Sequence, residues 1–353
     1  MQTNYVPNYQ LQLPPCSEGT FVISASNTMY KVDRTIGQGA FGRVYSGRDC
    51  NFDSARAFKV MSPHNAHLAY NEVQRLIALR SPRILHLHEA FIDNGGNLVL
   101  VQELADSDLA RFIWSWAGPS LRYCPEQSEL LTLKAAKELL EALALIHRSD
   151  IGHLDLHPGN IFVTCQNSLG SELRFPHYQN ALPAVAFKIG DFGIARDLRR
   201  IPGGQFNWSI SPPETLMGDE YRMDHRIDIY NIAMCLLQLY CGRTLSFTRQ
   251  ERLDGKPSRL ARSLRTRMGE VISLGLRRHP LYRPCSAEAY IQEFLSIERS
   301  GYSEWKRMHE VDEHCYGPYT PWQMRRSANP QRQNFSLAHV VASIDQTPRF
   351  HQR

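Results

Sequence analysis

Residues 153–160 read HLDLHPGN, and this stretch decides how the rest of the chain is interpreted. It places Asp155 five residues before Asn160, after a long run of apolar residues at helical spacing. A carboxylate can orient or accept the proton of a hydroxyl, and an amide oxygen is a hard ligand that suits Mg²⁺. The spacing therefore predicts a catalytic loop in which a carboxylate lies beside a metal ligand.

A second acidic motif, KIGDFGIARD, lies downstream at residues 188–197. Asp191 follows a strand-like apolar run and can supply another hard oxygen ligand for Mg²⁺, while Phe192 is free to pack inward. A plain turn gives the same three letters, Asp-Phe-Gly. The position directly after a strand and downstream of HLDLHPGN favours the metal-binding interpretation, because phosphoryl-transfer chemistry requires these groups in that order.

The segment IGQGAFGRVY, residues 36–45, has the pattern G-x-G-x-x-G-x-V. Glycines let a hairpin backbone approach phosphate groups closely, because a Cβ would collide or forbid the turn. Taken alone, this pattern fits a plain glycine turn between two strands about as well as it fits a phosphate-binding hairpin. A dinucleotide-binding loop would require a helix directly after the glycines. A strand-like run follows instead, which favours a hairpin that covers phosphates.

Lys59 lies in the apolar run ARAFKVM, where a strand would point it inward. A lysine there is costly unless an anion pairs with it. Glu72, on the helical run LAYNEVQRLIAL, is placed to form the Lys–Glu pair that positions the α- and β-phosphates of ATP. A snorkelling surface lysine and a solvated glutamate are the plain alternatives. The order of glycine turn, lysine and helix glutamate along the chain favours the pair.

The apolar pattern separates a strand-rich first part of the chain from a helical second part. Residues 30–104 carry runs of strand length with one helical segment, and residues 105–299 carry long helical periodicities. The expected fold is α+β, with a small β-rich lobe followed by a larger, mainly helical lobe. Residues 1–29 are expected to be a flexible extension, residues 165–185 a hairpin insertion and residues 300–353 a mostly disordered tail.

Composition bounds the class of protein. The 353 residues are 42% hydrophobic, which is enough for a large core, and the formal net charge of +5 is spread without a run typical of nucleic-acid binding. No apolar run approaches the ~20 residues of a membrane helix, and the start MQTNYVPNYQ lacks the apolar segment of a signal peptide. The eight cysteines form no C-x-x-C pair, which suits reduced thiols. We expect a cytoplasmic or nuclear monomer with no nucleic-acid or membrane partner.

The order of these motifs, from about residue 30 to residue 299, resembles the eukaryotic protein kinase family over roughly three quarters of the chain. The resemblance implies a bilobal kinase fold and transfer of the γ-phosphoryl group of ATP to a protein hydroxyl, with Mg²⁺. A protein substrate phosphorylated on Ser or Thr is expected, and Tyr remains open because His157 replaces the lysine that marks Ser/Thr kinases in the family. Lys59 and Asp155 are the expected catalytic residues, and Asn160 and Asp191 the expected metal ligands.

The resemblance also implies an ATP site. Gln102 resembles the gatekeeper, Glu103 to Ala105 the hinge that contacts adenine, and Val44 with Ala57 the roof over the base. The predicted nucleotide contacts are Ile36, Gly37, Gln38, Gly39, Ala40, Phe41, Gly42, Arg43, Val44, Ala57, Lys59, Glu72, Glu103 and Ala105.

Three residues in the second lobe support the same family. SPPE, residues 211–214, resembles the A-P-E end of an activation segment, and LYRP supplies Arg283 as the distant ion-pair partner of Glu214. Small-molecule kinases lack that pairing. RIDIYN places Asp228 at the start of a buried helix, where its carboxylate would accept hydrogen bonds from catalytic-loop N–H groups.

A narrower resemblance is to the Wee and Myt kinases, which phosphorylate and inhibit cyclin-dependent kinases. HLDLHPGNIFV, FKIGDFG, the EL of VQELADSDL and the insertion before FKIG carry it. Mos- and Bub-type kinases remain open.

Two positions depart from the family pattern. Leu154 replaces the arginine that receives an activation-loop phosphate in the family, so regulation by loop phosphorylation is less expected. His157 replaces the lysine that contacts the transferring phosphoryl group, and a histidine of ordinary pKa, about 6.5, carries less positive charge at neutral pH. His157 is still expected to act in catalysis. Slower turnover and a histidine held protonated by phosphates both remain open.

These departures leave three functions to weigh. The active protein kinase is favoured, because Lys59, Asp155, Asn160 and Asp191 are all intact. A pseudokinase scaffold is the alternative that Leu154 and His157 suggest. A small-molecule kinase is suggested by the letters HPGN, but SPPE and LYRP oppose it.

Overall fold

The computed structural model describes residues 15–39, 42–117, 125–165, 184–197, 210–217 and 224–299. All of them belong to the first of the two units into which the chain divides, Met1–Glu310. The expected tail, and nearly all of the expected hairpin insertion, lie outside the described residues.

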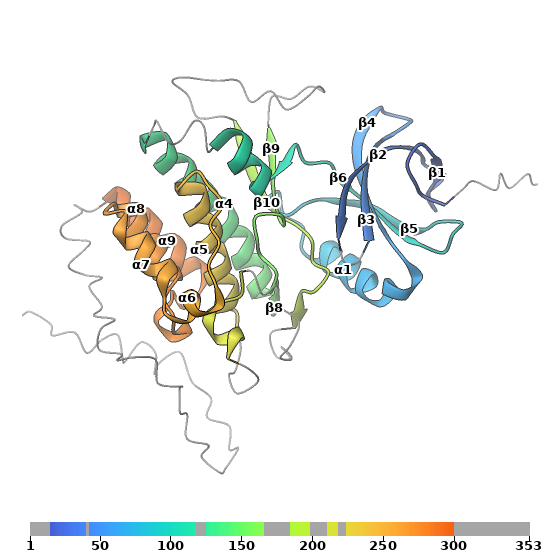
Figure 1. Cartoon of the computed structure of the whole chain (residues 1–353). Coiled ribbons are helices and arrows are strands. Elements are labelled where there is room, and N and C mark those ends of the chain that lie inside the picture. The colour runs from blue at the N-terminus through green and yellow to red at the C-terminus, as the bar shows by residue number, and fades with distance from the viewer. Residues whose placement is uncertain are drawn as a thin grey trace, which may run out of the picture. The chain divides into compact units, whose positions relative to one another are not determined.

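The first layer is a six-stranded antiparallel sheet in the order β1-β2-β3-β4-β6-β5 (Figure 1). Val32, Phe58, Val99 and Val101 pack in a core cluster on one face of this sheet, because side chains alternate along each strand. Its strands are β1 (Phe21–Ile23), β2 (Met29–Gly39), β3 (Gly42–Asp49), β4 (Ser54–Met61), β5 (Leu87–Ile92) and β6 (Leu98–Glu103). The short helix η1 (Pro63–Asn65) and helix α1 (Ala66–Ala78) connect β4 to β5.

Ordered structure begins before the expected boundary at Tyr30. Strand β1 pairs with β2, with Val22 opposite Tyr30, and the backbone N–H of Cys16 donates to Asp93 Oδ2 at 2.8 Å. Cys16 and Val22 are buried in the same cluster as Tyr30. The expected flexible extension through residue 29 is therefore too long, because a three-residue strand carries too little periodicity to be recognised from sequence.

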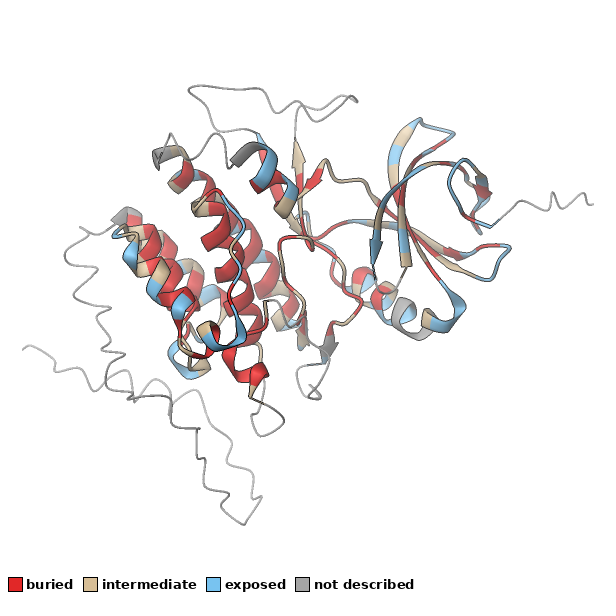
Figure 2. Ribbon diagram, in the orientation of Figure 1, coloured by how far each residue is buried: buried red, intermediate tan, exposed pale blue. Residues whose placement is uncertain are grey.

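The second part of the described chain is mainly helical and is built around α4 and α5. Every residue of α5 from Arg226 to Leu239 is buried, as expected of a helix surrounded by other elements (Figure 2). The helices are α2 (Leu109–Phe112), η2 (Ile113–Ala117), α4 (Pro125–Arg148), η4 (Pro213–Leu216), α5 (Arg226–Tyr240), α6 (Arg249–Leu253), α7 (Lys256–Ser263), α8 (Arg267–Gly275), η5 (Pro280–Tyr282) and α9 (Ala287–Arg299).

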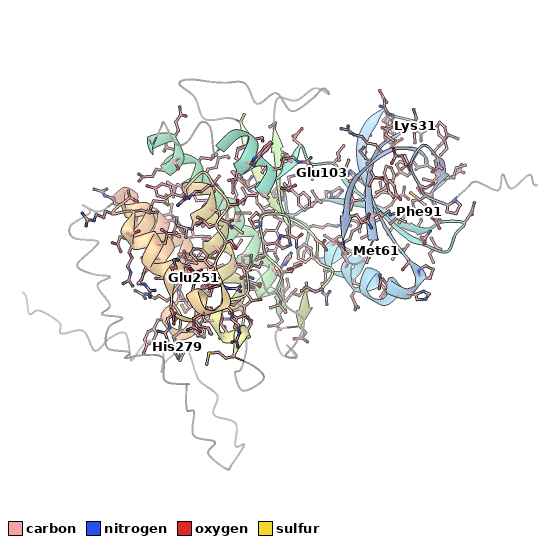
Figure 3. The ribbon with its side chains drawn as sticks, in the orientation of Figure 1. Lys31, Met61, Phe91, Glu103, Glu251 and His279 are labelled. Carbon is pink, nitrogen blue, oxygen red and sulfur yellow. The ribbon has the colours of Figure 1, made fainter. Side chains whose placement is uncertain are left out.

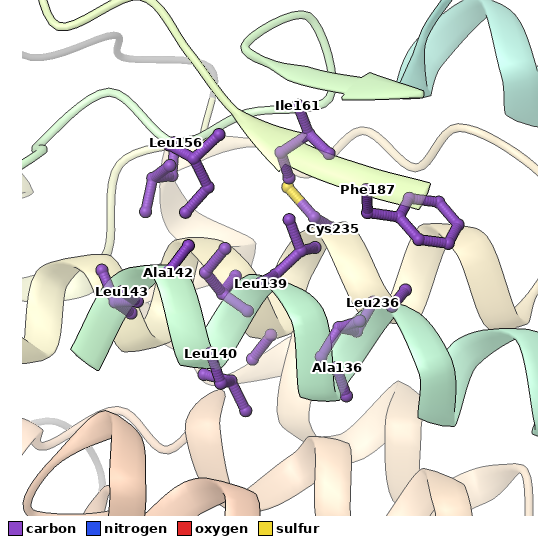
Figure 4. Close-up of a cluster of buried hydrophobic side chains, with 14 of the residues drawn as sticks. Ala136, Leu139, Leu140, Ala142, Leu143, Leu156, Ile161, Phe187, Cys235 and Leu236 are labelled. Carbon is purple, nitrogen blue, oxygen red and sulfur yellow. The ribbon is translucent and has the colours of Figure 1, made fainter. Parts of the chain in front are cut away.

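The core of this lobe joins the helices to two short strands. Leu139 of α4 and Cys235 of α5 lie in one cluster of buried side chains with Ile161 and Phe187 (Figure 4). These last two residues belong to a three-stranded sheet of order β10-β9-β7, and a two-stranded sheet pairs β11 with β8. The strands are β7 (Ser107–Asp108), β8 (Ile151–Gly152), β9 (Ile161–Cys165), β10 (Val185–Ile189) and β11 (Arg196–Asp197).

This arrangement positions both acidic motifs. HLDLHPGN connects β8 to β9, and Asp191 follows the end of β10, which pairs with β9. The predicted α+β architecture, with a small β-rich lobe followed by a larger helical lobe, is confirmed. Among the described helices, none combines the length and apolar character needed to span a bilayer.

Candidate active site

The strand register gathers four predicted residues on one face of the six-stranded sheet. Val44 lies opposite Lys59, and Ala57 lies opposite Gln102. Opposed residues of antiparallel strands share a face, and so do residues two apart on a strand. Val44, Ala57, Lys59 and Gln102 therefore form one surface, with Gln102 buried beside the lysine strand.

Lys59 is buried and held by two carboxylates. Its Nζ donates to Glu72 at 2.8 and 3.0 Å and to Asp191 Oδ1 at 2.7 Å. Burial alone would lower the pKa of Lys59, but the two carboxylates raise it above its ordinary value. Burial would likewise raise the pKa of Asp191, and Lys59 brings it below the ordinary value. The predicted Lys59–Glu72 pair is present, and it connects α1 to the motif after β10.

The three glycines of the hairpin differ in what surrounds them. A Cβ at Gly42 would lie 2.2 Å from the carbonyl oxygen of Val60, so the packing of β3 on β4 requires glycine there. A Cβ at Gly37 would meet only Val44, at 3.7 Å, and one at Gly39 would meet nothing within 4 Å. Neither residue has a positive φ. The surrounding protein therefore does not require glycine at positions 37 and 39. A ligand that approaches the backbone closely would require glycine there, because a Cβ would collide with it.

The other predicted contacts in the hairpin follow the same strands. Ile36 and Gln38 lie in β2 and Arg43 lies in β3. Ala40 and Phe41, at the tip, lie outside the described residues.

Glu103 is the last residue of β6 and lies at the expected hinge (Figure 3). Its carboxylate accepts hydrogen bonds from Lys188 Nζ at 2.6 and 2.7 Å, and its backbone N–H donates to the carbonyl of His86 at 2.9 Å. The Glu103 carboxylate therefore already has a partner, Lys188 of β10. Its carbonyl and the half-buried Ala105 that follows remain the groups suited to contact a base.

Asp155 and Asn160 are brought together as the sequence predicts. Asn160 Nδ2 donates to the Asp155 carbonyl at 2.9 Å and to Asp155 Oδ2 at 3.2 Å. The backbone carbonyl of Asn160 accepts a hydrogen bond from the backbone N–H of Gly190, next to Asp191, at 3.0 Å. Because its nitrogen is fixed by Asp155, the amide oxygen of Asn160 is the atom left to bind a cation.

The donor set suits Mg²⁺ held partly by phosphate. Among the described residues, no cluster of three or more His, Cys, Asp or Glu side chains is placed to hold a metal alone. Asn160 and Asp191 offer hard oxygens, and Mg²⁺ is usually bound by one or two protein ligands together with substrate phosphates. These residues fit such an ion.

The SPPE segment is tied to α5 through Arg283. Arg283 Nη1 and Nη2 donate to the two carboxylate oxygens of Glu214 at 2.5 and 2.7 Å, and Nη1 also donates to the carbonyl of Arg226 at 3.0 Å. The guanidinium carbon lies 4.8 Å from the centre of the Tyr230 ring. The predicted long-range ion pair is confirmed.

A comparison with protein families settles the family. The model of the protein kinase domain matches residues 30–280. The chain belongs to the protein kinase family.

Three similar proteins are serine/threonine-protein kinases by name. The kinase domain is 25% identical to Serine/threonine-protein kinase SSN3 of Phaeosphaeria nodorum, over 69% of this chain and 53% of that protein. It is 27% identical to a probable cyclin-dependent serine/threonine-protein kinase of Dictyostelium discoideum, over 60% and 14%. It is 26% identical to the human SNF-related serine/threonine-protein kinase, over 61% and 26%. The alignments thus cover about half or less of each relative.

The catalytic loop of the kinase domain is anchored by Asp228. The N–H groups of His153 and Leu154 donate to its carboxylate at 2.9 and 2.7 Å, and His147 Nε2 lies 3.0 Å from it. Burial would raise the pKa of Asp228, but the hydrogen bond with His147 brings it below its ordinary value. The predicted contact between Asp228 and the loop backbone is confirmed. Leu154 itself is buried with a left-handed backbone, at φ 67°.

His153 has a role that the sequence did not reveal. It is fully buried, its Nε2 lies 3.0 Å from the carbonyl oxygen of Gly190, and its ring centre lies 4.9 Å from that of Phe192. Burial lowers the pKa of His153, so the imidazole is neutral at pH 7. The side chain therefore joins the HLDLHPGN loop to the Asp-Phe-Gly motif. Its place at the start of HLDLHPGN was the only available signal.

His157 adopts a neutral form in the kinase domain. Its Nδ1 accepts a hydrogen bond from the N–H of Gly159 at 3.1 Å, which requires an unprotonated nitrogen, and its Nε2 lies 3.8 Å from Asp155 Oδ2. Burial first, and then the neighbouring His153, lowers the pKa of His157. His157 thus lies near the Asp155 carboxylate, without the positive charge of the lysine that the resemblance places at this position.

Proposed function

We propose that this kinase domain transfers the γ-phosphoryl group of ATP to serine or threonine hydroxyls of proteins, with Mg²⁺. Two sets of contacts carry the proposal: Lys59 binds Glu72 and Asp191, and Asn160 binds Asp155. The backbone hydrogen bond from Gly190, next to Asp191, to Asn160 joins the two sets. The names of its relatives support serine or threonine as the acceptor.

Each residue would have a distinct role in this reaction. Lys59, held by Glu72, would bind the α- and β-phosphates, and Gly37 and Gly39 would let the hairpin backbone approach them. Asn160 and Asp191 would hold Mg²⁺, which neutralises charge on the phosphates. Asp155 would orient the acceptor hydroxyl and take its proton.

The two departures from the family pattern change the expected regulation and rate. With Leu154 in place of arginine, and buried, the catalytic loop offers no guanidinium to an activation-loop phosphate, so we propose activity without that modification. A neutral His157 supplies less positive charge to the transition state than lysine would. Turnover slower than that of a lysine-bearing kinase follows.

The test is phosphoryl transfer from radiolabelled ATP and Mg²⁺ to generic protein substrates, beside a panel of small-molecule acceptors. Label is expected on protein serine or threonine, and Asp155→Asn should remove it. Label only on small molecules would overturn the protein acceptor. No transfer, with ATP binding retained, would favour a pseudokinase scaffold.

A narrower proposal is a Wee- or Myt-like regulator of the cell cycle, in the cytoplasm or nucleus. Its support is the wording of HLDLHPGNIFV and FKIGDFG. The purified domain should then phosphorylate a cyclin-dependent kinase and lower its activity. Labelling of that kinase with no loss of its activity would contradict this proposal.

A further inference from the structure

Two arginines of α6 hold the backbone of the described segment 210–217. Arg252 Nη1 donates to the carbonyl of Ser211 at 3.1 Å, and Arg249 Nη2 donates to the carbonyl of Leu216 at 2.5 Å. Both acceptors are neutral carbonyl groups. The two guanidinium charges therefore bind this segment without being neutralised by it.

Segment 210–217 is tied to the same helix turn as the catalytic loop. Arg283 links Glu214 to the carbonyl of Arg226, the first residue of α5. Two residues later, Asp228 binds the N–H of Leu154, which precedes Asp155. The segment that the two arginines hold is therefore joined to the loop that carries Asp155 through two residues at the start of one helix.

No carboxylate among the described residues forms an ion pair with Arg249 or Arg252. Arg252 is only 4% exposed, and its Nε is buried without a hydrogen-bond partner in the described part of the chain. Burial lowers the pKa of this guanidinium, with only the nearby Tyr230 acting in the opposite direction. A buried cation without an anion is costly, so the arrangement needs a reason.

The described acidic side chains of α6 and of segment 210–217, and Asp254 directly after α6, already have other partners. Glu214 accepts both of its hydrogen bonds from Arg283, and Asp254 accepts one from Gln250. Glu251, labelled in Figure 3, forms a capping box at the start of α6 and an ion pair with Lys256. None of these three carboxylates is available to neutralise Arg252.

The surrounding sequence is strongly basic. Residues 243–267 contain eight Lys and Arg and two Asp and Glu, a net charge of +6, against +5 for the whole chain. Such a concentration of one sign attracts anionic partners at long range. The +6 region includes both arginines that hold segment 210–217.

We propose that Arg249 and Arg252 select protein substrates that carry an anionic side chain close to the accepting serine or threonine. This inference rests on the proposed protein kinase function. The anion is an Asp or Glu carboxylate or a phosphorylated residue, since a guanidinium recognises both through paired N–H donors. Arg249 is exposed and meets the anion first, while Arg252 supplies a charge that no carboxylate in the described part of the chain neutralises.

The experiment compares kcat/KM for peptides that differ only beside the acceptor, with glutamate, phosphoserine, glutamine or lysine there. The kinase domain should prefer the glutamate or phosphoserine peptide over glutamine by about tenfold, as for a charge-assisted hydrogen bond. The glutamate and phosphoserine arms distinguish the two kinds of anion. Equal rates for glutamate, phosphoserine and glutamine would overturn the inference.

Three variants separate selection from structural support. Arg252→Gln should lower kcat/KM more for the acidic peptides than for the glutamine peptide, mainly through KM. Equal losses on all peptides would show that Arg252 only holds Ser211. Arg249→Glu, at an exposed position, should reverse the preference towards the lysine peptide even if Arg252 variants fold poorly. Arg243→Gln, an exposed arginine of the same basic region, is the matched control and should keep the wild-type preference.

These outcomes are distinct from failure of the proposed function. If the wild-type domain labels no peptide and no protein, the kinase function is wrong and the selection falls with it. If it labels all peptides equally, the function stands and only the selection is wrong.

Discussion

Lys59 and Arg252 are both buried cations, and they are treated differently by the fold. Lys59 has two carboxylate partners, at 2.8 Å from Glu72 and 2.7 Å from Asp191. Within the described residues, the Arg252 side chain has one hydrogen bond, to the neutral carbonyl of Ser211 at 3.1 Å. The charge of Lys59 is compensated by carboxylates before any ligand arrives, whereas no carboxylate among the described residues compensates the charge of Arg252.

The difference shows what each cation can do. A compensated lysine is fixed in place, so it can position a phosphate with little reorganisation, but it adds little net charge. An uncompensated arginine adds net charge and has donors to spare. One site is suited to orient a ligand that is always the same, and the other to discriminate among protein partners.

The largest effect is expected when Lys59 loses Asp191, a partner that is also a proposed metal ligand. Asp191→Asn should lower kcat by about a thousandfold, because a metal ligand and a fixed charge are both lost. Asp155→Asn should lower kcat by a similar factor but leave Mg²⁺-dependent nucleotide binding intact. Steady-state kinetics and nucleotide titrations with and without Mg²⁺ measure both. Wild-type kcat in Asp155→Asn would refute the catalytic-loop assignment.

Removing Lys59 should affect both activity and stability. Lys59→Met leaves the fully buried Glu72 without its cation, which typically costs about 3–5 kcal/mol, and should reduce kcat by about a hundredfold. The double variant Lys59→Met/Glu72→Met should recover most of the stability and none of the activity. Urea unfolding beside kinetics gives both quantities. Recovery of activity in the double variant would contradict the role of Lys59.

The matching test on the arginine side compares Arg283 with Arg252. Arg283→Met leaves Glu214 buried and unpaired and should cost about 3–5 kcal/mol in unfolding free energy. Arg252→Met removes only the hydrogen bond to the Ser211 carbonyl and should change the free energy of unfolding by about 1 kcal/mol. Chemical denaturation of the two variants side by side checks this. Equal losses would mean that Arg252 has an anionic partner within the protein.

Acidification should lower stability through His153, a buried basic side chain that is neutral, unlike Lys59 and Arg252. The folded pKa of His153 is lowered by burial, so its contribution to stability is complete above about pH 6.5 and is lost as the pH falls below that value. The slope is at most about 1.4 kcal/mol per pH unit. Lys59, whose folded pKa is raised, stays charged throughout this range. Urea midpoints at pH 7.5, 6.5 and 5.5 measure the slope, which His153→Gln should reduce.

The smallest effect is expected at His157. His157→Lys places a cation beside Asp155 and should raise kcat by about threefold, well within the tenfold that 1.4 kcal/mol represents. Because burial lowers the pKa of His157, wild-type kcat should not fall through titration of this group between pH 7 and 8. His157→Ala should be slower than both. A pH–rate series on the three proteins decides, and no gain for the lysine variant would end the idea.

The candidate site was predictable where chemistry fixes residue types at fixed spacings. Lys59, Glu72, Asp155, Asn160 and Asp191 follow from what a phosphate, a metal ion and a hydroxyl require. The order of strands before helices likewise followed from the change in apolar period, so the architecture was predictable.

Other features depend on packing between distant segments, which no local pattern encodes. Strand β1 is too short to show a period, and its stability comes from pairing with β2. The contact of His153 with Phe192 and the bond of Lys188 to Glu103 join residues 39 and 85 positions apart, respectively. The charge state of His157 depends on how deeply the loop is buried. In these cases the residue types can be read from the sequence, but the partners of these residues cannot be predicted from it.

The backbone at Leu154 and Asp191 has a consequence for how the enzyme fails when heated. Both residues have a left-handed backbone, at φ 67° and 58°, which costs about 1–2 kcal/mol for a residue with a side chain. Hydrogen bonds to Asp228 and Lys59 hold them there. Because the two loops can relax locally while the helical core stays intact, catalysis should be lost at a lower temperature than the fold.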